Sequence, residues 1–146
     1  VQNRHNDAIH DYTTAIDLNP QSLLAYQNRG LAYVITDDLN KALLDYNRYL
    51  ALRGAYDAGG SMIDTHLSSV LGNRGLIFAR MNQFEKALAD FNTAIKLNPY
   101  NPNNYLNRAF VFYRLGRVEQ AAQDVRMAEL TGRTVDPSFK KMLHMP

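Results

Sequence analysis

The sequence predicts an all-α solenoid of antiparallel helix hairpins, with about three and a half repeats and a C-terminal capping helix. Two observations lead to this fold class. The triplet Asn-Arg-(Gly/Ala) occurs three times, at residues 28–30, 73–75 and 107–109. An Asp followed by Tyr, Phe or Val recurs at residues 11, 45, 90 and 124, with spacings of 34, 45 and 34 residues. Self-similarity at such a period is typical of a repeated helix–turn–helix unit.

The first helix of each hairpin is predicted by residues that recur at i, i+4 and i+7. In the repeat that begins near residue 21 these are Tyr26, Gly30 and Tyr33, which share one face of a helix. The small residue at the centre of this face allows two helices to approach closely. The second helix has the same stagger, with a face formed by Ala42, Tyr46 and Tyr49.

Breaker residues mark the ends of these helices. The turns inside the hairpins are predicted at Asp37-Asp38, Asn82 and Gly116. Pro20 and Pro99 end two of the second helices within nearly the same sequence, AIDLNP and AIKLNP. Gly54 stands where the intervening unit would have its Pro.

We therefore expect a single domain over residues 1–146. Its predicted parts are a half repeat at 1–20, a repeat at 21–56, an insertion at 57–67, repeats at 68–101 and 102–132, and a capping helix with a tail at 133–146. Ser61 is expected to start a long helix that runs from Met62 to Met81. Asp136 as an N-cap and Pro137 after it predict the capping helix.

The half repeat has no first helix of its own in this sequence. We expect the helix around residues 6–18 to expose apolar surface, which a preceding helix or another copy of the chain would cover.

These patterns resemble the tetratricopeptide repeat family over nearly the whole chain. The first helix of that family, aromatic–small–aromatic, matches Tyr26, Gly30 and Tyr33. The second helix, Ala–aromatic–Ala–Pro, matches Ala8, Tyr12, Ala15 and Pro20. The departures are Tyr49 for a small residue, Gly54 for Pro and Val125 for an aromatic. The resemblance implies a right-handed superhelix with a concave groove for protein segments.

Each repeated Arg is expected to form an ion pair with a repeated Asp. Arg29, Arg74 and Arg108 lie one residue before the small position, and the second helices carry Asp11, Asp45, Asp90 and Asp124. Such pairs would hold one helix against another, within a repeat or between neighbours. The alternative is a row of Arg side chains that binds anions.

Each repeated Asn is turned about 100° around its helix from the Arg, toward the concave wall. Asn28, Asn73 and Asn107 would form a ladder there, and an amide can bond a peptide backbone of any sequence because it carries both a donor and an acceptor. This is similar to the asparagine ladder with which the tetratricopeptide superhelix of a sugar transferase holds extended polypeptide. The alternative is that Asn tolerates a solvated site or bonds the neighbouring helix.

The same wall is expected to carry an apolar residue three positions after each Asn. These are Leu31, Leu76 and Phe110, followed further along by Tyr113, Arg80 and Arg114. The apolar members could instead pack between helices. A clamp for chaperone C-terminal carboxylates is disfavoured, because its matching positions carry no cation: Gln27, Leu31, Asn73, Asn103 and Asn107.

The predicted function is a protein–protein interaction scaffold that binds an extended peptide or partner segment in the concave groove. The alternatives are self-assembly through the N-terminal end, or an accessory domain of a larger enzyme or of a secretion or assembly machine. No catalytic site, metal or cofactor is predicted, because the chain has no Cys and no P-loop, and its four His are scattered. A net charge of +2 is too small to indicate nucleic acid, and no apolar run reaches the length of a membrane span.

Overall fold

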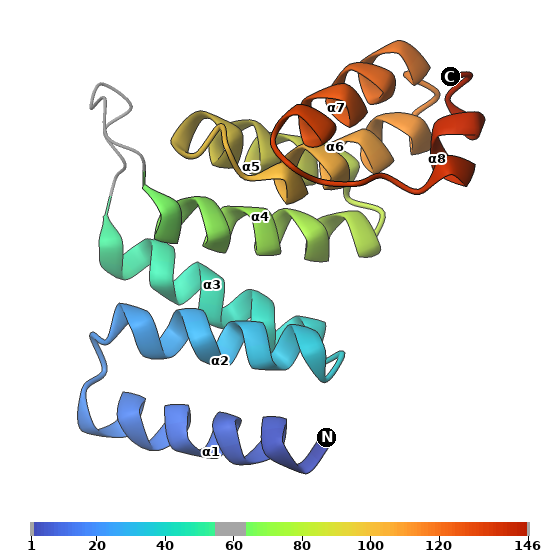
Figure 1. Cartoon of the computed structure of the whole chain (residues 1–146). Coiled ribbons are helices and arrows are strands. Elements are labelled where there is room, and N and C mark those ends of the chain that lie inside the picture. Colours follow the sequence, from blue (N-terminus) through green and yellow to red (C-terminus); the bar gives the residue numbers. More distant parts are fainter. Residues whose placement is uncertain (1, 55–63, 146) are drawn as a thin grey trace. The chain divides into compact units, whose positions relative to one another are not determined.

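Helices make up most of the chain (Figure 1). The computed structural model describes residues 2–54 and 64–145, and these contain eight α-helices and no strand. The predicted all-α class is confirmed. The contacts within the chain divide it into two compact units, Val1–Ser61 (unit 1) and Met62–Pro146 (unit 2).

Unit 1 consists of α1 (Gln2–Leu18), α2 (Leu23–Ile35) and α3 (Leu39–Arg53). Helices α2 and α3 form an antiparallel hairpin, and α1 packs against α2. The predicted faces of the hairpin are its core, because Tyr26, Ala42, Tyr46 and Tyr49 are all buried. Tyr49 is therefore a core residue despite its departure from the small residue of the pattern.

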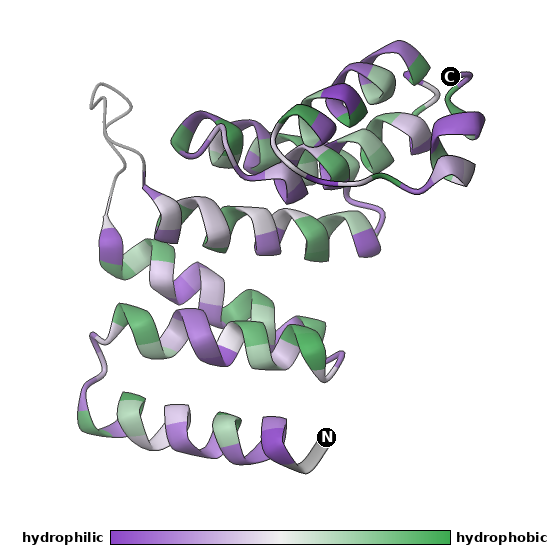
Figure 2. Ribbon diagram, in the orientation of Figure 1, coloured by the Kyte–Doolittle hydropathy of each residue, from purple (hydrophilic) through white to green (hydrophobic). Residues whose placement is uncertain are grey.

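Unit 2 consists of two hairpins and the short capping helix. Helices α4 (Thr65–Arg80) and α5 (Phe84–Leu97) form the first hairpin, and α6 (Pro102–Arg114) and α7 (Val118–Leu130) form the second. The capping helix is α8 (Pro137–Met142). The hydrophobic and hydrophilic stripes on these helices explain which faces pack together (Figure 2).

The turn inside each hairpin contains one residue in the left-handed region. The φ angles are 66° at Asp37, 57° at Asn82 and 72° at Gly116. Asn, Asp and Gly tolerate this conformation better than other residues do, so the predicted turn positions are confirmed. Gly54 also ends α3 with a positive φ of 81°, which a Pro could not adopt.

The two helices of a hairpin pack tightly at the repeated small residue. A Cβ atom added to Gly30 would stand 2.7 Å from Cε1 of Tyr46, and one added to Gly75 would stand 2.9 Å from Cε1 of Phe91. In the third hairpin this position is Ala109, and the residue sixteen further on is Val125. A smaller partner side chain leaves room for the extra methyl group, which explains Val125 as a departure from the aromatic pattern.

The N-cap of α4 differs from the expectation. Asp64 accepts a hydrogen bond from the Leu67 backbone N–H at 2.8 Å, and the helix begins at Thr65. A continuous helix from Met62 is contradicted at Asp64, whose extended backbone (φ −108°, ψ 91°) precedes the first helical residue, while Met62 itself lies outside the described residues. Residues 57–63 of the insertion, including the predicted N-terminal residue Ser61, lie outside the described residues.

Both terminal helices agree with the expectations. Asp136 accepts a hydrogen bond from the Ser138 backbone N–H at 2.7 Å, and Pro137 occupies the first position of α8. In α1, Tyr12 is only half-buried, whereas the equivalent Phe91 in α5 is fully buried. Leu18 at the end of α1 is 83% exposed, so this helix presents apolar surface.

Candidate peptide-binding site

The repeated Arg and Asp form ion pairs inside each hairpin. Nε and Nη2 of Arg29 donate to the two carboxylate oxygens of Asp45 at 2.8 and 2.7 Å. The pairs Arg74–Asp90 and Arg108–Asp124 have the same two-point geometry, with all four distances at 2.7 Å. The Asp side chains are at most 9% exposed. The expected ion pairs are confirmed, and they lie within a repeat rather than between repeats.

Aromatic rings and the preceding helix complete the surroundings of these Arg side chains. The guanidinium of Arg29 lies 5.8 and 5.9 Å from the ring centroids of Tyr26 and Tyr33. Its Nη1 also donates to Thr13 Oγ1 on α1 at 3.1 Å, and its hydrogen bond to Asp45 raises its pKa above the ordinary value.

The same arrangement recurs in unit 2. Nη1 of Arg108 donates to Asn92 Oδ1 on α5 at 2.6 Å. Because the donors of these Arg side chains are used within the fold, their role is to join three helices rather than to form an anion-binding row.

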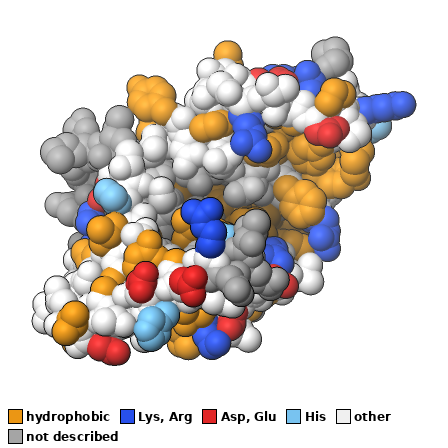
Figure 3. Space-filling model, turned by 60° about the horizontal axis from the view of Figure 1, so that its bottom comes forward, with side chains coloured by type: hydrophobic (Ala, Val, Ile, Leu, Met, Phe, Trp, Pro, Cys, Tyr) orange, Lys and Arg blue, Asp and Glu red, His pale blue; other side chains and the backbone are white. Residues whose placement is uncertain are grey.

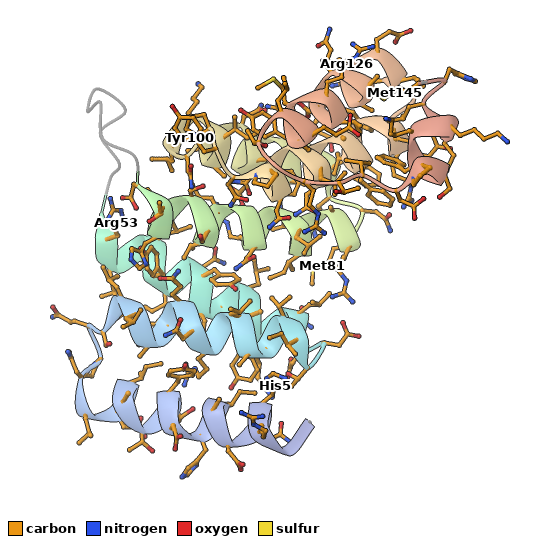
Figure 4. The ribbon with its side chains drawn as sticks, viewed as in Figure 1. His5, Arg53, Met81, Tyr100, Arg126 and Met145 are labelled. Carbon is orange, nitrogen blue, oxygen red and sulfur yellow. The ribbon has the colours of Figure 1, made fainter. Side chains whose placement is uncertain are left out.

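A pocket in unit 2 brings together residues from both first helices and the C-terminal segment. Its volume is about 570 Å³. The lining residues come from α4, from the turn after it, from α6 and from the segment that enters α8: Leu76, Ala79, Arg80, Asn82, Leu106, Asn107, Phe110, Arg114, Val135, Asp136 and Phe139. Figure 4 locates the α4 end of this region through Met81, the residue directly after that helix.

The floor of the pocket is apolar and partly open. Phe110 is 47% exposed, although it is a large aromatic side chain in the middle of α6. Phe139 comes from α8 and meets Tyr113 edge-on, with ring centroids 5.9 Å apart. The space-filling view likewise shows hydrophobic side chains beside Lys and Arg toward the right of the visible face (Figure 3). Such a surface can take up an apolar group from a ligand.

Charged groups on the pocket wall are two Arg and one Asp. The guanidinium of Arg114 stacks on Phe84 and Phe110, at 5.3 and 5.9 Å from their ring centroids, and its Nη2 donates to Asn82 Oδ1 at 3.2 Å. The hydrogen bonds that Asp136 accepts from Ser138 lower its pKa, so this carboxylate is ionised at neutral pH.

Five of the nine residues predicted for the groove line this one pocket. They are Leu76, Arg80, Asn107, Phe110 and Arg114. Tyr113 lies beside the pocket through its contact with Phe139, and Asn73 is half-buried on α4 outside the lining. Asn28 and Leu31 belong to unit 1, on α2.

The three repeated Asn share one property. No side-chain hydrogen bond joins Asn28, Asn73 or Asn107 to any other residue in the part of the chain that the structure describes. This disfavours the alternative in which these amides bond a neighbouring helix, and the ladder stays a prediction.

The sequence reasoning missed the wall that the C-terminal segment contributes. Val135, Asp136 and Phe139 line the pocket, although the segment was expected only to cap the solenoid. The signal was present: Asp136-Pro137 repeats Asn101-Pro102, and both pairs consist of an N-cap followed by Pro at the first helical position. The tail helix therefore starts as α6 does, and its residues contribute to the same pocket.

The described residues contain neither a metal-binding cluster nor a membrane-spanning helix. Residues 2–54 and 64–145 contain no group of three or more His, Cys, Asp or Glu side chains placed to hold a metal ion. Within the same ranges, no helix combines the length and the hydropathy that crossing a membrane requires.

The repeated hairpin, its left-handed turn and its internal Arg–Asp pair define a helical-repeat protein. A model of the tetratricopeptide repeat matches residues 1–58, and a second model of the same repeat matches residues 75–116. The chain belongs to the tetratricopeptide repeat family.

The curated relatives are longer proteins. The chain is 34% identical over 122 residues to human tetratricopeptide repeat protein 6, which corresponds to 84% of the chain and 21% of the relative. It is 32% identical over 97 residues to human serine/threonine-protein phosphatase 5, which corresponds to 66% of the chain and 17% of that enzyme. The chain thus spans about a fifth of the length of these relatives.

Solved structures with the same fold include one with a bound peptide and one described as having a peptide-binding site. The second tetratricopeptide domain of Spaghetti (RPAP3), bound to the HSP90 peptide SRMEEVD, has a TM-score of 0.65 and 19% identity, covering 90% of this chain and 97% of that one. YrrB, described as having an unusual peptide-binding site, has a TM-score of 0.69 and 17% identity, covering 96% of this chain and 64% of that one. At these identities the likeness shows the fold.

Proposed function

We propose that this chain is a protein-interaction scaffold whose unit 2 binds an extended peptide in the pocket between α4, α6 and α8. The observation that carries the proposal is the pocket itself. Its lining exposes apolar side chains such as Phe110 and includes an amide, Asn107, and the guanidinium group of Arg114. A concave, mostly apolar site with a few polar groups is the usual form of a ligand site.

The peptide-bound relatives support this assignment by fold. The structure of the Spaghetti domain was solved with the peptide SRMEEVD, and YrrB is described as a peptide-binding protein. The family consists in general of non-catalytic scaffolds. The activity named for phosphatase 5 is not transferred, because the chain matches only 17% of that enzyme.

Typical interaction free energies indicate which contacts would dominate the affinity for a peptide. A neutral hydrogen bond from Asn107 to a peptide backbone contributes about 0.5–1.5 kcal/mol, and even three such bonds fall short of the roughly 8 kcal/mol that micromolar binding requires. Full burial of a large apolar side chain contributes about 1.5–3 kcal/mol, which is more than any one of these hydrogen bonds. We therefore expect the Phe110 floor to be the main source of affinity, and Asn107 to orient the peptide backbone.

A library of extended peptides presented to the 146-residue chain tests this function. We expect the wild type to select peptides with a large apolar residue, and Phe110→Ala to weaken their binding about tenfold or more. Leu130→Ala is the matched control, because Leu130 is 79% exposed and does not line the pocket. An unaltered affinity in a folded Phe110→Ala protein would exclude the pocket as the binding site.

The predicted asparagine ladder is tested by a separate set of variants. We expect Asn107→Ala to weaken the selected peptides by a few-fold, within the range of one hydrogen bond. If the triple variant Asn28→Ala, Asn73→Ala and Asn107→Ala binds no worse than the single variant, only one rung contacts the peptide.

Self-association through α1 is a second candidate, favoured by the exposure of that helix. Tyr12 is half-buried at a position that is fully buried in α5, and Asp11 is exposed. Light scattering over a concentration series measures it. A mass that rises with concentration in the wild type, but not in Tyr12→Ser, is the expected result for an α1 interface.

A further inference from the structure

We infer that the pocket of unit 2 selects peptides in which a large apolar side chain stands one or two residues from a carboxylate, which Arg114 binds. This inference rests on the proposed function of the pocket and names the class of its ligand. The carboxylate can belong to Asp, to Glu or to the C-terminus of the peptide, since all three present the same pair of oxygens to a guanidinium.

Arg114 is the first reason. Its side chain is exposed, yet two rings and one amide hold it: it stacks on Phe84 and Phe110 and donates to Asn82 Oδ1 at 3.2 Å. A guanidinium that stacks through its faces keeps its N–H edges for hydrogen bonds. Because the side chain is already ordered, a ligand that bonds to it loses less conformational entropy on binding.

The charge of Arg114 is the second reason. Arg74 and Arg108 on the same pair of helices each bond a buried carboxylate at 2.7 Å. Among the described residues, by contrast, no carboxylate lies within ion-pair distance of Arg114. The equivalent residue on α4, Arg80, also lines the pocket.

Asp136, the one acidic residue that lines the pocket, does not neutralise the charge of Arg114. Asp136 already accepts hydrogen bonds from the backbone N–H and the hydroxyl of Ser138, at the start of α8. The carboxylate on the wall is therefore engaged within its own helix cap and forms no ion pair with Arg114. A ligand with one negative charge complements this arrangement.

The spacing along α6 sets the spacing in the ligand. Asn107 and Arg114 are seven residues apart, which corresponds to about 10 Å along a helix. An extended peptide covers that distance in about three residues. Phe110 lies between them, so an apolar side chain over Phe110 stands one or two residues from a carboxylate at Arg114.

A small set of peptides tests the inference by fluorescence anisotropy. The parent peptide has a Phe with a Glu two residues away on each side, in a Gly/Ser background, with an acetylated N-terminus and an amidated C-terminus. A second peptide carries Gln for both Glu, a third carries both Gln with a free C-terminal carboxylate directly after the second of them, and a fourth carries Ser for Phe. The protein variants are Arg114→Gln and the matched control Arg117→Gln, an exposed Arg that does not line this pocket.

We expect the wild type and Arg117→Gln to bind the Glu peptide about fivefold more tightly than the Gln peptide, the size of a partly exposed charge pair. In Arg114→Gln this ratio should fall to about one. The third peptide shows whether a C-terminal carboxylate serves as well as a side chain. Arg114→Lys controls for misfolding of the Arg114 variants. It keeps the positive charge, so it should retain part of the preference for the Glu peptide over the Gln peptide.

The outcomes separate the inference from the function on which it rests. Equal binding of the Glu and Gln peptides to the wild type, or an unchanged ratio in Arg114→Gln, overturns the inference and leaves the peptide-binding pocket standing. Equal binding of the Phe and Ser peptides overturns the apolar subsite, and with it the proposed function.

Discussion

The hairpin of unit 1 and the two hairpins of unit 2 are the same at their centres and different at their surfaces. Each of the three contains the Arg–Asp pair with distances of 2.7–2.8 Å and a left-handed residue in its turn. The position two turns after the repeated Asn differs, because it is Ile35 in unit 1 but Arg80 and Arg114 in unit 2. The residues that build the hairpin are the same in both units, and the residue at this surface position is not.

The α2 surface of unit 1 is accordingly apolar where unit 2 is mixed. Leu24, Leu31 and Ile35 lie on one face of α2 and are 57%, 43% and 54% exposed. In unit 2 the pocket combines Leu76 and Phe110 with two Arg. We therefore expect the two units to differ in the charge of the ligands they accept, although their backbones are built alike.

The largest expected effect comes from breaking the shared centre. Asp90→Ala leaves the partly buried guanidinium of Arg74 without its carboxylate, and we expect a loss of about 3–5 kcal/mol in the free energy of unfolding. Urea denaturation measures this loss. The pair in unit 1 should respond in the same way to Asp45→Ala.

Asp11→Ala is the matched control, at the same position of the repeat. Asp11 is exposed on α1 and has no ion-pair partner among the described residues, so we expect a change below about 0.5 kcal/mol. Equal losses for Asp11→Ala and Asp90→Ala would contradict a stabilising role for the pair.

A second, smaller effect concerns the tight contact between Gly75 on α4 and Phe91 on α5. Gly75→Ala places a methyl group 2.9 Å from the Phe91 ring, and we expect a cost of about 1–3 kcal/mol. The third hairpin combines Ala109 with Val125 instead. In a Phe91→Val background the cost of Gly75→Ala should therefore shrink, because the ring that obstructs the methyl group is gone.

A double-mutant cycle on thermal or urea denaturation measures this coupling. The same cost of Gly75→Ala in both backgrounds would show that the two positions are independent, and that the Ala109–Val125 combination is not a compensation.

The smallest effect is expected at the position where the units differ. Ile35→Arg introduces the unit 2 residue at an exposed site of unit 1, and we expect a change within about 0.5 kcal/mol of zero. Ala32→Arg is the control on the same helix, where the side chain is buried and a large loss should follow. A large loss for Ile35→Arg would show that Ile35 belongs to the core of unit 1.

Sequence reasoning succeeded where one repeat predicts the next. The turn residues, the small–aromatic contacts and the Arg–Asp partners all recur at fixed spacing, so the chain itself supplies several examples of each. It failed at the start of α4, which the period does not cover, and it missed that the capping segment lines the pocket. The insertion before Asp64 interrupts the period, and the residues after Thr131 resemble a repeat only at their N-cap and Pro.

A buried polar contact in unit 2 also escaped prediction. Asn104 Nδ2 donates to Ser68 Oγ at 3.1 Å, and that hydroxyl donates to the Ala94 carbonyl at 2.9 Å. The Asn104 amide lies against Gly72, where no side chain intervenes. Three polar or small residues from α4 and α6 meet here, and no spacing in the sequence relates them, because the contact depends on how two hairpins pack.

The sequence by itself determined the helices, the hairpin turns and the identity of the groups that pair within a hairpin. These are short-range properties, set by periodicity, backbone preference and neighbours at a fixed separation along the chain. Only the tertiary structure decided that Leu76, Phe110 and Phe139 share one pocket, and that Arg114 is held by aromatic rings instead of a carboxylate. Those contacts join helices far apart in the sequence, and they depend on packing distances that no single helix specifies.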